Sequence, residues 1–581
     1  MNDTTVKSND TWQRIKELAQ SWLEDPGVEE YEGLNITALQ RDEAYIVGSA
    51  DRDIGIYSVS DDCFRCPFEL HKKIAAGTKE TWVNNTARRA TWRVYTNTTE
   101  QYITTRNTTN MICQLRPDLG QFGVYRLNAS GEGCNFTTSK EPVVIYKPLL
   151  LLLGVLIGAW LLYGIVKLIM SRIRVTGKLR YGDKELAIQQ RLRALDTFRG
   201  IAIVFMIFVN DGAGGYWWLE HATWNGLLAG DLVFPAFLWI MGVCIPLSVK
   251  SSFAKGVPRW KIVLQIVRRS CMMFLLGMSL NTVYGRNMLQ QLRIFGVLQR
   301  LAVSYLIGAG FYALTAPKYY TPPRGSCGQA LKDVLACMWC WVLAVILVAV
   351  HSTITFTVHD PNCPIGYLGP GGKHDDWVAE DCGGGAAGYI DRLVLGEAHM
   401  FQNSDAKRIY GGLRTEPEGL LGCLTSAVQV LLGVQAGVTV LLQRSHKSRI
   451  SRWLSFGVVF ALVGALLAGF SREHGIVPIN KNLWSISFVL VTSACCLVLL
   501  CVCYTFTDVW RTWGGGPFRA PGLNAIVLYV GHSLAARLFP FHWRIPIMRT
   551  HGIYLVEAVW GTALWVIIAH VMAKKKVFIT L

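Results

Sequence analysis

Charged residues are scarce in this chain of 581 residues. They make up 17% of it, against about a quarter in an average soluble domain. Acidic side chains are the rarer sign, with 40 Asp and Glu against 57 Lys and Arg, while apolar types reach 51% and include 20 Trp. With a mean hydropathy of +0.30, the chain carries more apolar surface than a soluble domain can cover. The composition therefore predicts a polytopic α-helical membrane protein.

Other features are missing and narrow the class further. No stretch interleaves basic and aromatic side chains as nucleic-acid sites do, so we expect no nucleic acid partner. No internal repeat and no matched pair of interrupted apolar segments is present, which argues against an inverted-repeat transporter. The opening MNDTTVK has neither a positively charged leader nor an apolar core. Either a signal peptide has been removed, or this is not the native start.

Five apolar runs each approach the roughly 20 residues that span a bilayer core. Six weaker candidates contain charges or prolines, so we expect about eleven transmembrane helices. An odd number places the two ends of the chain on opposite sides of the membrane. The clear runs are residues 148–170, 331–350, 419–442, 483–506 and 552–572, and the weaker ones are 194–211, 227–249, 262–280, 292–314, 453–470 and 521–539.

Two independent signals give the orientation. Eight N-glycosylation sequons precede the first span, which predicts a luminal N-terminal segment. With that orientation, the short cytosolic loops carry 22 Lys and Arg and the short luminal loops carry 5, as the positive-inside rule requires. The C-terminus, ending in KKKVFITL, is then cytosolic. The sequons are at Asn2, Asn9, Asn35, Asn84, Asn97, Asn107, Asn128 and Asn135.

The luminal parts are predicted to be a small β-rich domain over residues 1–146 and a glycine-rich loop over 352–417. The loop belongs to the membrane domain, residues 147–581, and either folds over the luminal face as a lid or is a plain connector. Six of the 16 cysteines fall in these parts, an even number in an oxidising compartment, so disulfides are expected with undetermined pairing. A zinc site at the single CxxC is the weaker alternative. The six are Cys63, Cys66, Cys113, Cys134, Cys363 and Cys382.

Ionisable residues inside spans are costly and indicate function by default. The segment RLRALDTFRG places Asp196 and Arg199 three residues apart at the cytosolic end of the second span, on one helix face. One interpretation is an ion pair that anchors the helix. The other is that Arg191, Arg193 and Arg199, with Lys250 on the next cytosolic loop, bind a phosphorylated ligand.

The luminal end of the same span leads into a second polar cluster. Asn210 ends the span, and YWWLEHATWNGLLAGDLVFP follows with His221 and Asp231. A lone histidine near an interface is more often structural than catalytic, and its tryptophan neighbours are typical of an aromatic belt. Asp231 is either a buried partner for a cation or imidazole, or a helix-end residue in water, and its leucine neighbours favour burial.

The blocks RLRALDTFRGIAIVFMIFVN, YWWLEHATWNGL and DLVFPAFLWIMG, in that order, closely resemble the heparan-α-glucosaminide N-acetyltransferase family. GYLGPGG, GGAAGYIDRLVLG, EPEGLLG and VPINKNLWS are similar to later blocks of that family. The resemblance implies a lysosomal membrane enzyme that transfers acetyl from cytosolic acetyl-CoA to the terminal glucosamine amine of heparan sulfate. It also implies no metal cofactor.

The resemblance places the family's essential histidine on His221 and its motif asparagine on Asn210, and we infer that Asp231 orients the imidazole. His221 then acts as a nucleophile or as a general base. A homodimer is a further expectation. The alternatives are an O-acyltransferase of another glycan and a polytopic solute transporter. The residues assigned to binding acetyl-CoA are Arg191, Arg193, Asp196, Arg199, Trp224, Asn225 and Lys250.

Overall fold

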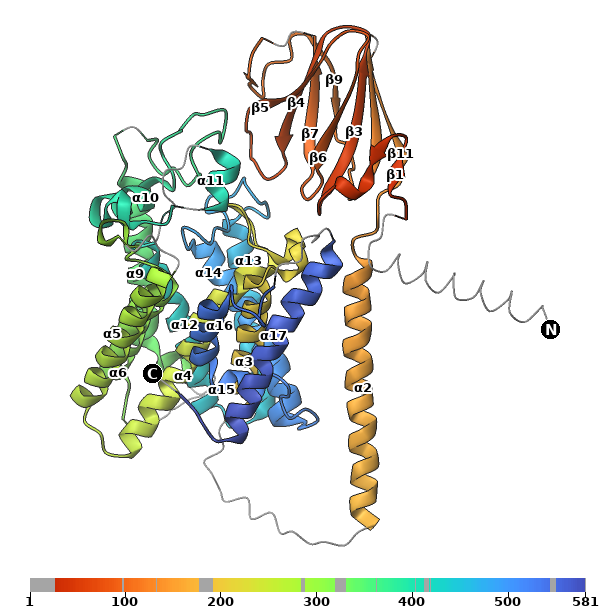
Figure 1. Ribbon diagram of the computed structural model, residues 1–581. Coiled ribbons are helices and arrows are strands. Elements are labelled where there is room, and N and C mark those ends of the chain that lie inside the picture. Colours follow the sequence, from red (N-terminus) through yellow and green to blue (C-terminus); the bar gives the residue numbers. More distant parts are fainter. Residues whose placement is uncertain are drawn as a thin grey trace, which may run out of the picture.

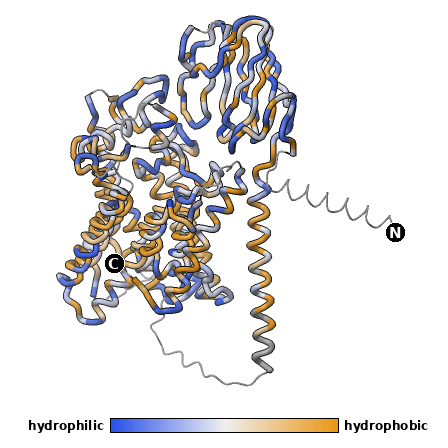
Figure 2. Tube along the Cα trace, in the orientation of Figure 1, coloured by the Kyte–Doolittle hydropathy of each residue, from blue (hydrophilic) through white to orange (hydrophobic). Residues whose placement is uncertain are grey.

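The protein consists of a β-rich body at one end of a bundle of helices (Figure 1). The bundle helices are hydrophobic along most of their length, whereas the β-rich body mixes hydrophilic and hydrophobic positions (Figure 2). This computed structural model describes residues 27–96, 99–131, 133–176, 192–283, 288–318, 331–361, 363–402, 404–411, 417, 419–543 and 550–579.

The β-rich body, here called the β domain, consists of residues 30–140. A four-stranded sheet in the order β11-β10-β3-β6 and a five-stranded sheet in the order β8-β5-β4-β7-β9 enclose an apolar core. β3 pairs with β10 in parallel and with β6 in antiparallel register. The bounds are β1 Glu30–Tyr31, β2 Leu34–Asn35, β3 Glu43–Ala50, β4 Ile54–Ser60, β5 Phe68–Ile74, β6 Lys79–Asn85, β7 Ala90–Tyr95, β8 Tyr102–Ile103, β9 Met111–Leu115, β10 Val124–Ser130 and β11 Gly133–Lys140.

In the described part of the chain, nine helices are long and apolar enough to cross a membrane. The prediction of a helical membrane bundle is confirmed, although two of the eleven expected spans differ from the rest. α3 carries three charged residues among 18, and α16 has only 11 residues. The helices at the eleven predicted positions are α2 Lys147–Thr176, α3 Arg193–Asn210, α4 Val233–Ala254, α5 Arg259–Val283, α6 Val297–Thr315, α9 Met338–Thr357, α12 Gly422–Leu442, α13 His446–Leu467, α14 Ile486–Tyr504, α16 Ala525–Ala535 and α17 His551–Lys574.

Glycines let α4 and α12 pack closely at the centre of the bundle. A Cβ atom added to Gly433 would lie 2.2 Å from the carbonyl oxygen of Trp239, and one added to Gly437 would lie 2.4 Å from that of Val243. On α4, a Cβ atom added to Gly242 would lie 2.1 Å from the carbonyl oxygen of Val430 on α12. Small residues four apart are a common means of close approach between membrane helices. This contact fixes the position of α4, which forms one wall of the cavity described below.

All six cysteines predicted to form disulfides are paired, as Cys63–Cys66, Cys113–Cys134 and Cys363–Cys382. Cys113–Cys134 joins β9 to β11 and therefore connects the two sheets. Because Cys63 and Cys66 bond to each other, the zinc alternative does not describe the CxxC motif in this structure.

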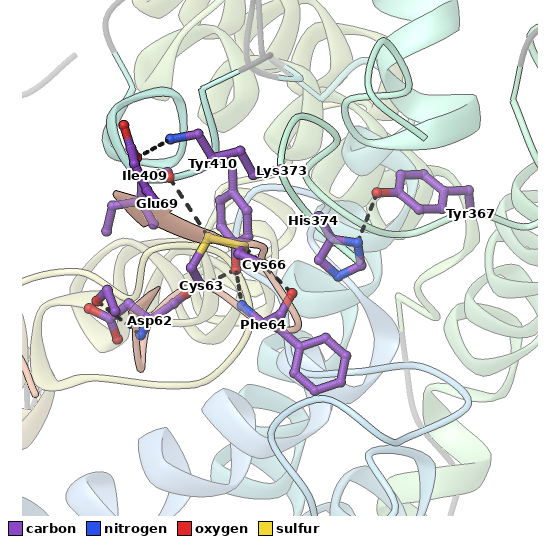
Figure 3. Close-up of a disulfide and its surroundings, with 11 residues drawn as sticks. Asp62, Cys63, Phe64, Cys66, Glu69, Tyr367, Lys373, His374, Ile409 and Tyr410 are labelled. Carbon is purple, nitrogen blue, oxygen red and sulfur yellow. Dashed lines mark hydrogen bonds and ion pairs between the residues drawn. A yellow bond between two sulfur atoms is a disulfide. The ribbon is translucent and has the colours of Figure 1, made fainter. Parts of the chain in front are cut away.

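The hairpin of residues 61–66, closed by Cys63–Cys66, docks the β domain onto the long loop 352–417 (Figure 3). The Tyr410 hydroxyl donates to the carbonyl oxygen of Asp62 at 2.9 Å, and Phe64 packs against His374 with ring centroids 5.8 Å apart. The loop is folded, with α10 Gly385–Leu395 and α11 Asp405–Tyr410. It therefore lies at the same end of the bundle as the β domain.

The β domain makes a second contact where α17 begins. His551 Nε2 lies 2.8 Å from Asp42 Oδ1, and its Nδ1 lies 2.9 Å from the Gly214 carbonyl oxygen. Gly215 has a φ of +74°, and a Cβ there would meet the Arg41 guanidinium at 1.9 Å. The turn after α3 is therefore shaped by contact with the β domain.

The opposite end of the bundle holds the N-terminal end of α3 and the end of the described chain. Asn524 separates the short helix α15 (Arg519–Leu523) from α16, and its Nδ2 donates to the Val577 carbonyl oxygen at 3.1 Å. α15 packs on α3 so closely that a Cβ on Gly200 would lie 1.7 Å from the Phe518 carbonyl oxygen. α17 therefore runs from the β domain to the end of the bundle where α3 begins.

Candidate active site

His221 and Asp231 form a hydrogen-bonded pair beside the end of α3. His221 Nδ1 lies 3.0 Å from Asp231 Oδ1, and because a carboxylate only accepts, Nδ1 is the donor. The imidazole is 40% exposed, whereas the carboxylate is fully buried. This geometry places a ring proton on Nδ1, and no hydrogen bond to Nε2 is found among the described residues.

Asp231 also organises the backbone around it. It lies in the short helix η4 (Ala229–Leu232), and its Oδ2 accepts the amide protons of Ala222 and Leu228, both at 3.0 Å. A Cβ on Gly230 would lie 2.9 Å from His221 Nδ1. The His221 ring, the Asp231 carboxylate and two backbone amides therefore contact one another, and the absence of a side chain at Gly230 leaves room for them.

Lys481, from the loop between α13 and α14, is the third member of this group. Its Nζ lies 3.3 Å from Asp231 Oδ1, the oxygen that also meets His221. Its loop is joined to the segment that carries His221, since Asn480 Nδ2 donates to Asn225 Oδ1 at 3.0 Å and Gly226 N donates to the Ile479 carbonyl oxygen at 2.8 Å. The site is therefore built from two chain segments about 250 residues apart.

Asn225 acts as the connection between these segments. Its Nδ2 donates to Glu473 Oε2 at 2.6 Å, and its carbonyl oxygen accepts from Arg472 Nε at 3.0 Å. Burial raises the pKa of Glu473, and the hydrogen bond from Asn225 and the charge of Arg472 only partly offset that effect. Arg472 also reaches Asp62 of the β domain at 3.4 Å. The contacts of Asn225 thus hold the loop of His221 in place.

A cavity of about 520 Å³ extends from His221 through the bundle. It follows α3 from Asn210 to Arg199, a rise of about 16 Å at 1.5 Å per residue. His221, Asn210 and Lys481 line one end, and Arg199 also contributes to the wall. Most of the wall between them is apolar, and it comes from α3, α4, α5, α6 and α16: Ile203, Met206, Val209, Val233, Phe234, Phe237, Ile240, Met241, Ile245, Met273, Val297, Leu298, Leu301, Ala525 and Ile526.

Two guanidinium groups line the cavity, from α3 and α5. Arg269 lies 4.9 Å from the centroid of the Tyr305 ring, and Arg199 Nη2 lies 3.8 Å from Asp196 Oδ1. The first amides of α3 are bound by the Asp508 carboxylate, which accepts from Ala194 N at 2.8 Å. The N-terminal end of α3 therefore already binds a carboxylate. The groups of α3 and α5 in the cavity wall that can bind an anionic ligand are the side chains of Arg199 and Arg269.

Asn210 contacts a histidine far away in the sequence. Its Nδ2 donates to His532 Nε2 at 2.9 Å, and His532 Nδ1 donates to the Leu528 carbonyl oxygen at 3.1 Å. The next residue, Asp211, meets His542 Nε2 at 3.2 Å. Burial and the neighbouring Glu557 carboxylate raise the pKa of Asp211 to about 6, against the opposing effect of His542.

The structure thus brings together some of the predicted site residues. His221, Asn210 and Arg199 line the cavity, and Asp231 holds His221. Arg193 and Lys250 are exposed and Asp196 is buried, all three outside the cavity lining as the described residues define it. Trp224 and Asn225 are also outside it, because their side chains bond to Leu368 and to the loop of Lys481. Arg191 lies outside the described residues.

Sequence reasoning missed three residues of the site. Lys481 and Arg269 line the cavity, and His532 holds Asn210. Lys481 is one of the few basic residues in a predicted luminal loop, which was a usable signal. Within the described residues, no group of three or more His, Cys, Asp and Glu is arranged to hold a metal ion, and the expectation of a metal-free reaction stays a prediction.

Comparison with known proteins identifies the family of the chain. The family model described as "Heparan-alpha-glucosaminide N-acetyltransferase, catalytic" matches residues 191–323, which include Asn210, His221 and Asp231. The heparan-alpha-glucosaminide N-acetyltransferase of Mus musculus is 34% identical over 572 residues, covering 90% of this chain and 86% of the mouse protein. The Homo sapiens enzyme of the same name is 40% identical over 400 residues, covering 68% of this chain and 60% of the human protein. The chain belongs to the heparan-α-glucosaminide N-acetyltransferase family.

Proposed function

We propose that this protein transfers an acetyl group from acetyl-CoA, bound from the cytosol, to the amine of a terminal α-glucosamine of heparan sulfate in the lysosomal lumen. The observation that carries the proposal is the single cavity that joins two guanidinium groups to a hydrogen-bonded imidazole. Acetyl-CoA is charged and cannot cross a bilayer unaided. An enzyme that joins the two substrates must therefore offer such a passage.

The cavity has the size of a small-molecule site, and its wall suits the chemistry of acetyl-CoA. A volume of about 520 Å³ is within the roughly 300–1,000 Å³ typical of small-molecule sites. Arg199 and Arg269 provide cations for phosphate groups, and bidentate guanidinium contacts are the strongest that a side chain makes with phosphate. The apolar wall between them and His221 suits the pantetheine arm, so the thioester is expected beside the imidazole.

At that position His221 can act as a base. The sugar nitrogen attacks the thioester carbonyl carbon, the C–N bond forms and the C–S bond breaks. The proton of the amine passes to His221 Nε2 and then to the departing CoA sulfur. Asp231 stabilises the imidazolium that forms between these steps. An acetyl-imidazole formed on the same nitrogen is the other route, and acetyl retained on the protein without acceptor distinguishes the two.

Asn210 is proposed to stabilise the oxyanion of the thioester carbon. One of its two amide protons is bound to His532, which fixes the side chain and leaves a second donor. Preorganised donors of this kind are worth about 3–4 kcal/mol in well-studied enzymes. Among the other predicted residues, Arg191, Arg193 and Lys250 remain proposed contacts at the cytosolic surface. Asp196 is proposed to orient Arg199, and Trp224 and Asn225 to position the catalytic loop.

The proposed topology has a luminal N-terminus and a cytosolic C-terminus. Five of the glycosylation sequons, at Asn35, Asn84, Asn107, Asn128 and Asn135, belong to the β domain, and α10, α11 and the start of α17 lie at the end of the bundle that carries it (Figure 1). The end of α17 meets Asn524 at the other end of the bundle, beside the start of α3. His221 is then luminal and the arginines lie toward the cytosol. A homodimer in the lysosomal membrane remains part of the proposal.

A substrate panel tests the function. Purified protein in detergent is supplied with acetyl-CoA and with heparan fragments that end in glucosamine, in N-acetylglucosamine or in a sugar with only hydroxyl groups. Acetylation of the first fragment alone supports the proposal. Acetylation of the hydroxyl-only fragment would favour an O-acyltransferase, and solute flux without acetyl-CoA consumption would favour a transporter.

His221→Ala tests the assigned base. Its kcat should fall at least 10³-fold, while acetyl-CoA still raises the thermal unfolding temperature of the variant. Turnover close to wild type would show that the reaction does not depend on this imidazole.

A further inference from the structure

Lys481 has no role in the reaction as described so far, although it lines the cavity beside His221. Its ammonium and the imidazole approach the same carboxylate oxygen, at 3.3 Å and 3.0 Å. Asp231 therefore faces one permanent cation and one group that is cationic only when protonated.

The position of Lys481 is fixed by its neighbours. Asn480 is fully buried. Its side-chain Oδ1 accepts a hydrogen bond from the backbone amide of Leu483 at 2.8 Å, and its backbone amide donates to Ser485 Oγ at 3.0 Å. With the bond from Asn480 to Asn225, these contacts hold the backbone on both sides of Lys481. The side chain is 25% exposed, which places most of it against protein.

The charges near His221 can be counted from the contacts. Asp231 contributes one negative charge with no exposure to solvent, and the two backbone amides on its other oxygen are neutral. A buried carboxylate beside an imidazole favours the protonated ring, and a cation on the same carboxylate opposes that effect. Among the described residues, further charged and titratable groups lie around the ring and its cavity: Glu220 beside it in the chain, Arg88 of the β domain 4.0 Å from that carboxylate, Arg199 on α3, Cys244 on α4, Arg269 on α5, Tyr305 on α6, and Tyr529 and His532 on α16.

We propose that Lys481 is a positioning residue that offsets the charge of Asp231, so that His221 accepts a proton at Nε2 less readily than it would beside that carboxylate alone. This inference rests on the proposed function, in which His221 accepts the amine proton. An imidazole that was already protonated could not do so, and the lumen that holds the acceptor is expected to be acidic. Asp231 then orients the ring, while Lys481 limits how strongly this carboxylate favours protonation of the ring.

The test measures protonation of His221 directly, because the acceptor amine itself titrates and would distort an activity profile. Diethyl pyrocarbonate modifies unprotonated imidazoles, and His221 is exposed enough to react. The full-length protein in detergent is labelled without substrates at pH values between about 4.5 and 8. Modification of the peptide that contains His221 is quantified by mass spectrometry for wild type, Lys481→Met and Lys481→Arg.

In Lys481→Met, the pH midpoint of labelling should move up by about one unit, the shift expected when a single opposing charge within about 4–6 Å is removed. Lys481→Arg keeps the charge and should keep the wild-type midpoint. A thermal unfolding scan verifies that each variant is folded.

Two results would overturn the inference. One is a Lys481→Met midpoint equal to wild type in folded protein. The other is a midpoint in Lys481→Arg that moves as far as in Lys481→Met, which would mean that shape and not charge matters. Neither result affects the proposed function, which is tested separately by the substrate panel and by the turnover of His221→Ala.

Discussion

Replacing Asp231 with Asn is the most direct test of the site, because four donors converge on this one carboxylate. Oδ2 accepts the amides of Ala222 and Leu228, and Oδ1 meets His221 Nδ1 and Lys481 Nζ. Asparagine has almost the same shape but a single acceptor oxygen. If that oxygen keeps the two backbone amides, the new NH₂ group faces the imidazole.

The consequence is a change of tautomer. Nδ1 of His221 must then accept a hydrogen bond, which moves the ring proton to Nε2 and removes the lone pair that takes the amine proton. In a serine protease, the corresponding change lowers kcat about 10⁴-fold. Here we expect a loss of about 10³ to 10⁴, equivalent to about 4–5.5 kcal/mol of transition-state stabilisation. The cost in folding stability should be smaller, because Lys481 is 25% exposed and water can solvate its charge.

The assay measures kcat with a glucosamine-ended acceptor at saturating acetyl-CoA, and binding of acetyl-CoA through the shift in unfolding temperature. Glu220→Gln is the matched control. It also changes a carboxylate to an amide next to His221, but that side chain is 46% exposed and lies 4.0 Å from Arg88. It should change kcat less than about threefold. If folded Asp231→Asn kept more than a tenth of the wild-type kcat, the tautomer argument would be refuted.

Three further predictions concern the rest of the molecule. Arg269→Ala should raise the KM for acetyl-CoA roughly tenfold, the effect of losing one charged hydrogen bond, and should change kcat less than threefold. Initial rates at varied acetyl-CoA concentrations measure both constants. A tenfold loss in kcat with an unchanged KM would contradict the prediction. Gly433→Ala should lower stability by about 1–3 kcal/mol, because the added Cβ meets a carbonyl oxygen at 2.2 Å, whereas Gly310→Ala, with open space around it, should not; thermal unfolding in detergent compares them. The pKa of Asp211 in the folded protein is about 6 against an ordinary 3.8, so the folded state holds this proton more tightly than the unfolded state. The free energy of unfolding of wild type should therefore rise by roughly 1 kcal/mol relative to Asp211→Asn as pH falls from 7 to 5. Equal dependence of that free energy on pH in the two proteins would contradict the prediction.

The fold was largely predictable because lipid imposes local rules. A span must be about 20 residues of apolar helix, so it can be read from a continuous stretch of sequence, and the six luminal cysteines could be grouped by compartment. The predicted count of eleven depended on two segments that break these rules. α3 combines Asp196 and Arg199 with a buried face, and the segment 521–539 is interrupted at Asn524, which bonds to the C-terminal tail.

The candidate site was predictable only where its residues are close in sequence. Asn210, His221 and Asp231 fall within 22 residues, so one polar segment in an apolar context drew attention to them, and the family resemblance then assigned roles to His221 and Asn210. His532 lies 322 residues from Asn210, and Lys481 and Arg269 come from separate segments. Their approach depends on how α5, α16 and the loop before α14 pack, and side-chain packing of that kind has no local signature. Arg193 and Lys250 were predicted as ligand contacts because they are basic and lie at helix ends. The positive-inside rule also places basic residues there, so this position alone does not indicate a binding role.

The contacts of the catalytic loop explain why the β domain belongs to the same protein as the bundle. Asp62, at the base of the disulfide hairpin, binds Arg472, which in turn donates to the Asn225 carbonyl oxygen four residues after His221. Arg88 of the β domain lies 3.1 Å from the same Asp62 carboxylate and covers the Trp217 ring at 4.8 Å. The loop of His221 is thus held both by the β domain and by the loop of Lys481. Because a shift of about 1 Å in such a group is enough to slow catalysis about 100-fold, we expect the β domain to be a structural part of the candidate active site.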